Sequence, residues 1–255
     1  MKQTFGPGAT TWVGLENFVA AMGDPLFHTA VANTLLFMVG SVGTQIPAAL
    51  GLALLLNQPS IRGRMALRLL FFSPQLVGLV LVAMLTRVVF EKQTGLVNTS
   101  LHAIFPSWDL EFPWLEEHVL ATLVLASFWM WTGFHMVFFL AALQNVPREL
   151  HEAASIDGAG PVRRFFVVTL PAILPVASFV TMLSVLGSLQ LFELPYVVFG
   201  GGGPENRGLT VVTYLYQTGF ESGDLGYSSA IGWLLAIMLL VASAFMLLAG
   251  RARHA

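Results

Sequence analysis

Five long stretches without a charged residue dominate this chain of 255 residues: 29–56, 69–86, 119–147, 165–192 and 225–250. A helix needs about 20 apolar residues to cross a hydrocarbon core of roughly 30 Å. Helices are the favoured spanning structure because lipid offers no partner to an unpaired backbone group. We therefore expect an all-α polytopic membrane protein with five spans. We place them at about 29–56, 69–90, 119–143, 165–192 and 225–250.

The composition excludes most other classes of protein. Hydrophobic residues make up 56% of the chain and charged residues only 10%, whereas a soluble domain carries about 25% charged residues. The net charge of −2 gives no basic footprint for nucleic acid. The absence of Cys removes disulfides, thiol catalysis and thiolate metal sites.

The distribution of charge predicts the orientation in the membrane. Eight of the twelve Lys and Arg residues follow the first, third and fifth spans, and eleven of the fourteen acidic residues lie on the other side. Basic residues mark the cytoplasmic side. We therefore expect the loop at about 144–170 and the tail at 251–255 to be cytoplasmic.

The remaining segments complete the expected organisation. Residues 1–28 are read as an extracytoplasmic lead-in with a short amphipathic helix around 16–22, and 29–250 as the transmembrane domain. The stretches 91–118 and 193–224 are read as long outer loops. Arg87, near the end of the second span, can extend its side chain outward from the lipid.

The most informative loop carries the sequence HEAASIDG at 151–158. We expect a short helix that begins near 145–147, where Asn145 can cap it and Pro147 suits a first turn. Gly158 can end that helix in a left-handed turn. Ala153 and Ala154 give the helix a small-residue face, which another protein could grip. The alternative is a polar connector between two spans.

Signals of catalysis are weak. The glycine run at 200–203 is not followed by the Gly-Lys-Ser/Thr of a phosphate-binding loop. The six His residues are scattered without the spacing of metal ligands. We therefore predict no enzyme activity, no metal site and no cofactor.

Polar residues within the spans are candidates for a substrate pathway. Ser184 and Ser188 share one face of the fourth span with Gly187 and Leu191. Such a face either packs helix against helix or lines a polar path. We list Gln45, Gln75, His135, Ser184, Ser188 and Gln190 as candidates. His135 lies deep in the third span, where an ionisable group indicates either function or a hydrogen-bonded packing residue.

The loop also matches a known motif. Glu152-Ala153-Ala154, three residues, Gly158, nine residues, then Val168-x-Leu170-Pro171 resembles the EAA loop of binding-protein-dependent ABC importer permeases. Val168 replaces the usual Ile. The segments 13–18, 33–35, 141–144 and 201–204 are similar to the carbohydrate branch of that family, which includes the maltose and glycerol-3-phosphate systems.

This resemblance implies a set of partners. They are a dimer of ATP-binding-cassette ATPase subunits, a second and non-identical permease subunit, an extracytoplasmic solute-binding protein, and the lipid of a bacterial inner membrane. It implies that Glu152, Ala153, Ala154 and Gly158 form a coupling helix that docks on the ATPase, and that Leu170-Pro171 sets the angle into the fourth span.

Members of the family also begin with a further transmembrane helix ahead of the region matched by 13–18. We therefore expect either a misplaced start site or a truncated form.

The resulting prediction is an importer permease for a sugar or related polyol, driven by a partner ATPase. An ion- or proton-coupled secondary carrier is the alternative, although the spans lack buried acidic residues for coupling. A membrane-embedded enzyme would need a paired nucleophile and base or a metal cluster.

Overall fold

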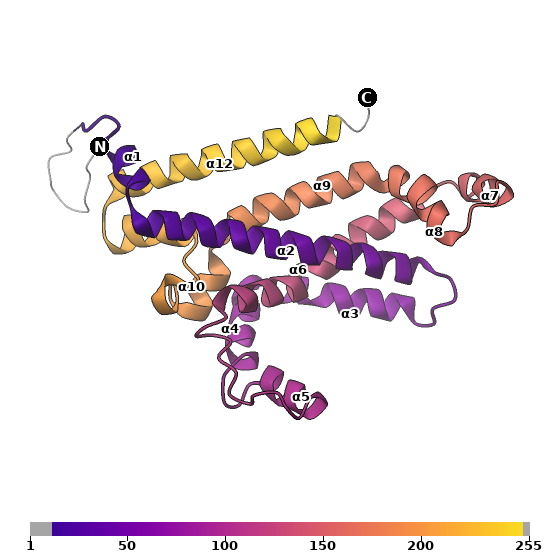
Figure 1. Ribbon diagram of the computed structural model, residues 1–255, viewed down its shortest axis with the longest axis horizontal. Coiled ribbons are helices and arrows are strands. Elements are labelled where there is room, and N and C mark those ends of the chain that lie inside the picture. Colours follow the sequence, from indigo (N-terminus) through magenta and orange to yellow (C-terminus); the bar gives the residue numbers. More distant parts are fainter. Residues whose placement is uncertain (1–11, 252–255) are drawn as a thin grey trace.

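The computed structural model describes residues 12–251, which form helices and no strands in that range. Residues 1–11 and 252–255, which include parts of the predicted lead-in and tail, lie outside the described residues. Four long helices run side by side in Figure 1: α2 (Pro25–Asn57), α6 (Val119–Gln144), α9 (Leu170–Leu189) and α12 (Leu225–Arg251). They correspond to four of the five predicted spans.

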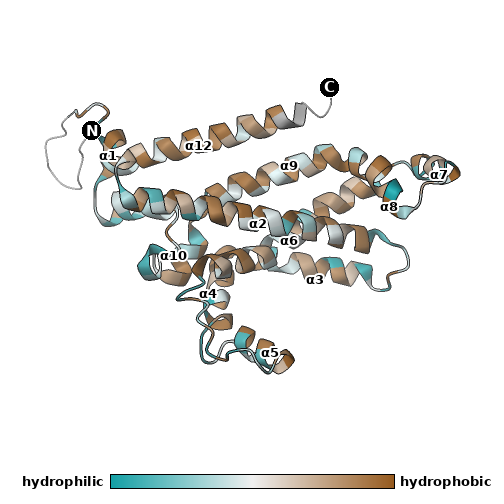
Figure 2. Cartoon of the chain, viewed as in Figure 1, coloured by the Kyte–Doolittle hydropathy of each residue, from teal (hydrophilic) through white to brown (hydrophobic). Residues whose placement is uncertain are grey.

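The long helices consist mainly of hydrophobic residues (Figure 2), and many of these side chains face outward. Leu36 and Val39 of α2, and Leu240 and Phe245 of α12, each keep more than 60% of their surface exposed. Four helices are long and apolar enough to cross a membrane, or five if one bent pair counts as a span. The fold class predicted from the sequence is confirmed.

The second span differs from the prediction of one helix over 69–90. It consists of α3 (Arg64–Val77) and α4 (Leu79–Val89), which meet at an angle of 100°. Gly78 joins them with a φ of +87°, a conformation that glycine adopts without a steric penalty. As a result α4 turns away from the bundle axis (Figure 1) and packs against α10 (Glu193–Phe199).

The predicted outer loops also contain helices. α5 (Leu96–Ile104) lies within 91–118. Within 193–224 lie α10, a 3₁₀ turn (Pro204–Asn206), α11 (Val211–Tyr216) and a π-helical segment (Gln217–Glu221). Polar contacts from the spans hold them in place. The Asn33 amide donates to the carbonyls of Asn206 and Leu209, at 2.9 and 3.1 Å.

The outer end of α2 is fixed by a partly buried carboxylate. Asp24 caps the helix, accepting from the Leu26 amide at 2.8 Å, and also accepts the hydroxyl protons of Tyr214 and Tyr227. Burial opposes ionisation of Asp24, but these hydrogen bonds outweigh it and hold the pKa of the carboxyl below its usual value. The cluster joins α2, α11 and α12 beside the short α1 (Glu16–Met22), a helix that the sequence predicted.

Close packing joins α3 to α6. A Cβ atom at Gly133 of α6 would lie 1.8 Å from the Phe71 carbonyl oxygen of α3. Only glycine therefore allows the two backbones to approach this closely.

The fourth span begins before α9. Helix α8 (Pro161–Arg164) and a π-helical segment (Phe165–Thr169) continue into α9, giving an apolar span of 29 residues. Pro171 follows at the start of α9 and lacks the amide proton of a regular helical turn.

Candidate functional site

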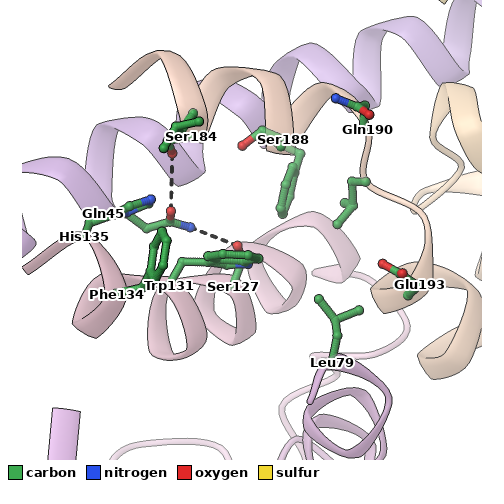
Figure 3. Close-up of a pocket in the computed structure, with 14 residues that line it drawn as sticks. Gln45, Leu79, Ser127, Trp131, Phe134, His135, Ser184, Ser188, Gln190 and Glu193 are labelled. Carbon is green, nitrogen blue, oxygen red and sulfur yellow. Dashed lines mark hydrogen bonds between the residues drawn. The ribbon is translucent and has the colours of Figure 1, made fainter. Parts of the chain in front are cut away.

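A cavity of about 130 Å³ lies among α2, α6 and α9, inside the bundle (Figure 3). Leu79 and Glu193, at the starts of α4 and α10, also line it. The full set of lining residues is Phe37, Gln45, Leu79, Ser127, Trp131, Phe134, His135, Leu183, Ser184, Gly187, Ser188, Gln190, Leu191 and Glu193.

Helical spacing explains how the residues of two of the three cavity walls, those from α9 and α6, come to share one face of their helix. Ser184, Gly187, Ser188 and Leu191, the face predicted from the fourth span, all line the cavity. On α6, the spacing i, i+4, i+7 and i+8 brings another set to one face, namely Ser127, Trp131, Phe134 and His135. A Cβ atom at Gly187 would meet nothing within 4 Å, as expected for a position beside open space.

Gln45 links the three walls. Its amide nitrogen donates to Ser127 Oγ at 2.9 Å, and its amide oxygen accepts from Ser184 Oγ at 3.4 Å (Figure 3). All three side chains are buried. Because both hydrogen bonds come from other helices, the Gln45 amide has a fixed orientation between them.

His135 is buried in the same wall, with only 3% of its surface exposed. Its ring lies 6.3 Å from the ring of Trp131, in a stacked orientation. Within the described part of the chain, its Nδ1 has no hydrogen-bond partner. A buried polar atom usually has such a partner, so this atom is available to a bound molecule.

Five of the six predicted pathway residues lie in this cavity. They are Gln45, His135, Ser184, Ser188 and Gln190. Gln75 does not line it and lies in α3, where its Oε1 is buried without a partner among residues 12–251.

Sequence reasoning missed several lining residues. Ser127 and Phe134 were not singled out, although their spacing from His135 was available as a signal. Glu193 was not among the predicted pathway residues either, but the fold brings it to the cavity. Of the lining residues in the described part of the chain, Glu193 is the only one with a formal charge.

The predicted coupling segment lies at the opposite end of the spans from α10 (Figure 1). Helix α7 (Arg148–Ile156) has no buried residue. Glu152 and Ala153 are exposed, and Ile156 keeps 87% of its surface accessible. The helix therefore presents its side chains to whatever lies beyond the bundle.

The end of α7 follows the predicted turn. Gly158 has a φ of +75°, its amide donates to the Ser155 carbonyl at 3.1 Å, and the Ala159 amide donates to the Ala154 carbonyl at 2.9 Å. This pair of bonds is the Schellman motif. The helix begins at Arg148 with Pro147 at the N-cap position, next to the predicted start near 145–147. Asn145 does not cap it, because its side chain donates to the Ala141 carbonyl at the end of α6.

Among residues 12–251, no group of three His, Asp or Glu side chains is placed to hold a metal ion. The site is lined by neutral polar, aromatic and leucine side chains, with one carboxylate at its edge.

Comparison with known proteins places the chain in a family. Residues 45–252 match the model of the binding-protein-dependent transport system inner membrane component. The arabinooligosaccharides transport system permease AraP of Halalkalibacterium halodurans is 39% identical over 93% of this chain and 75% of its own length. The lactose transport system permease LacF of Rhizobium radiobacter is 36% identical over 94% of this chain and 81% of its own length.

Solved structures agree. A chain of a bacterial ABC transporter that imports the acidic polysaccharide alginate matches with a TM-score of 0.84 and 25% identity, over 95% of this chain and 85% of the other. A bacterial alginate transporter in complex with a pentasaccharide-bound periplasmic protein matches with a TM-score of 0.81 and 25% identity, over 92% and 81%. The chain thus belongs to the family of inner membrane components of binding-protein-dependent transport systems.

Proposed function

We propose that this chain is the permease subunit of an ATP-binding-cassette importer that carries a sugar or related polyol. The observation that carries this proposal is the polar and aromatic cavity among α2, α6 and α9. Relatives named for arabinooligosaccharide and lactose transport support the substrate class. The family is a transport component, so ATP hydrolysis belongs to a partner subunit.

The chemistry of the cavity suits a sugar. A sugar hydroxyl both donates and accepts hydrogen bonds, and Gln45, Ser188 and His135 supply atoms of both kinds. The face of an aromatic ring is negative, so Trp131 and Phe134 can attract the weakly positive C–H groups of a sugar ring. A cavity of about 130 Å³ is small beside the roughly 300–1,000 Å³ of sites for drug-sized ligands. It would hold one end of a longer sugar chain.

Helix α7 is the proposed contact with an ATPase dimer. Glu152 would make the polar contact, Ala153 and Ala154 the close packing, and Gly158 the turn that ends the helix. Leu170 and Pro171 begin α9, whose other end lines the cavity. Movement of α7 would thus be transmitted along the fourth span to the substrate.

The proposed setting is a bacterial inner membrane with α7 and the C-terminus in the cytoplasm. The charge distribution supports this orientation, because basic residues gather on the α7 side. A second, non-identical permease subunit would complete the pathway. An extracytoplasmic solute-binding protein would deliver substrate at the α10 end. The secondary-carrier alternative has no support from the family, whose description includes a binding protein.

Uptake by the reconstituted importer tests the function. Vesicles containing the permease pair, the ATPase and the binding protein should accumulate a labelled arabinooligosaccharide only with internal ATP. Uptake that continues without the ATPase and follows an ion gradient would establish a secondary carrier instead.

Cross-linking tests the role of α7. The chain has no Cys, so Ala153→Cys provides a single reactive site. We expect nucleotide-sensitive cross-links to single Cys residues on the ATPase surface. Ser222→Cys, exposed near the other end of the bundle, is the matched control. Absence of cross-links from Ala153→Cys in an intact complex would reduce α7 to a connector.

A further inference from the structure

A row of four aromatic rings lies beside the cavity on the outer segments α10, α11 and the π-helical segment that follows. Phe192 stacks on Tyr196 at a centroid distance of 5.1 Å. Tyr196 meets Tyr216 at 5.0 Å, and Tyr216 stacks on Phe220 at 5.2 Å. Phe192 also lies 5.1 Å from Tyr216, so these three rings form a cluster that Phe220 extends. We call the four rings the aromatic row.

The aromatic row extends from the chain segment beside the cavity to the surface. Phe192 lies in the chain between Leu191 and Glu193, which both line the cavity. At the other end, Phe220 keeps 60% of its surface exposed.

Carboxylates accompany the rings. Glu221 is exposed and accepts the Tyr196 hydroxyl proton at 3.2 Å, while Glu193 stands at the cavity edge. These two are the only charged residues of α10, α11 and the π-helical segment. The exposed ring of Phe220 is followed directly in the chain by Glu221. This pair suits a sugar ring, with its C–H groups over the aromatic ring and its hydroxyls on the carboxylate.

We propose that the aromatic row is an outer subsite that binds a neutral oligosaccharide and directs its end toward the cavity. The inference rests on the proposed sugar-importing function and adds a second site to it. The two carboxylates should favour a neutral oligosaccharide, because Glu193 and Glu221 would repel the negative charge of a uronate or sugar phosphate at short range.

Direct binding tests the subsite without transport. Ser222→Cys places a fluorophore beside Phe220 in an otherwise Cys-free chain. The labelled importer, without binding protein, is titrated with arabinotetraose. We expect a saturable signal whose Kd rises about fivefold with Phe220→Ala, a loss of the order attached to one aromatic contact. Phe220→Trp should retain the affinity.

The control is Phe105→Ala, since Phe105 has a similar exposure of 58% but lies beyond α5, outside the row. It should leave the Kd unchanged. A flat titration, or a Kd that Phe220→Ala does not change, would overturn the subsite. The tryptophan variant separates loss of the ring from misfolding.

Two further results define the proposal. Trigalacturonate should bind about tenfold more weakly than the neutral arabinotriose, and equal or tighter binding would overturn the selection for neutral chains. Uptake is measured separately. A saturable titration without ATP-driven uptake would overturn the importing function and leave the subsite standing. Normal uptake with a flat titration would overturn the subsite alone.

Discussion

The cavity wall and helix α7 lie in one chain but use their polar residues in opposite ways. Gln45, Ser127 and Ser184 are buried and bonded to one another across three helices. On α7, by contrast, Glu152 is exposed and no residue is buried. The cavity is held together by the chain itself, whereas α7 offers a surface that the chain does not use.

This difference predicts that mutations in the two regions will affect different properties, stability in one and transport in the other. Substitutions around the cavity should lower the stability of the isolated subunit, because their partners are internal. Substitutions on α7 should leave stability unchanged and remove transport, because the partner is another protein. The following predictions run from the largest expected effect, on stability or on transport, to the smallest.

The largest effect is expected from Gly133→Ala. The new methyl group would lie 1.8 Å from the Phe71 carbonyl oxygen, so α3 and α6 must separate, at a cost of about 3 kcal/mol. Thermal unfolding in detergent measures the loss. Gly187→Ala is the control, because its methyl group would meet nothing within 4 Å. Equal melting temperatures for the two variants would contradict the close packing.

Gln45→Leu should have a smaller effect on stability and a clear one on transport. It leaves the Ser127 and Ser184 hydroxyls without their Gln45 partner, which costs about 1 kcal/mol. Sugar uptake should fall about tenfold as a polar contact is lost. Thr44→Val on the same helix removes only two bonds to the helix's own backbone, at Gly40 and Ser41. If both variants transport alike, the cavity is not the sugar site.

Glu152→Ala should separate the two regions most clearly. We expect uptake to fall at least about tenfold, as for loss of one charge-assisted contact, with no change in melting temperature because Glu152 is exposed. Glu149→Ala removes the same charge from the first turn of α7 and should transport nearly normally. A drop in stability would show that α7 does have an internal partner.

The smallest effect is expected at acid pH in the Asp24 cluster. The pKa of Asp24 is held below its usual value of 3.8, so its stabilisation is complete above that pH and disappears as the pH falls through the lower, folded-state value. The melting temperature should therefore fall below about pH 4. Asp24→Asn should lack this component, and Tyr214→Phe should reduce it. An identical acid profile in Asp24→Asn would exclude the cluster as its source.

The long helices could be predicted from the sequence because lipid favours an apolar residue at nearly every position of a span. The charge-free stretch 29–56 became α2 (Pro25–Asn57), and 119–143 became α6 (Val119–Gln144). The face of Ser184 and Ser188 was also predicted, since helical spacing is a local property.

Other features depend on contacts between distant residues. The hydrogen bond from Asn33 to Asn206 spans 173 positions, and such contacts fix the outer helices that were predicted as loops. The bend at Gly78 had no local signal beyond the glycine itself. Glu193 reaches the cavity only because the chain turns between α9 and α10.

The π-helical segment at Phe165–Thr169 sets the rotational phase of the fourth span. A π turn holds one residue more than an α turn, and one residue corresponds to roughly 100° about the axis. The extra residue thus fixes which side of α8 stands above the cavity face of α9. Removing it would leave the side chains of α7 unchanged but rotate that helix by about a quarter of a revolution relative to Ser184. The docking face of α7 would then point in a different direction from the one that the cavity face of α9 requires.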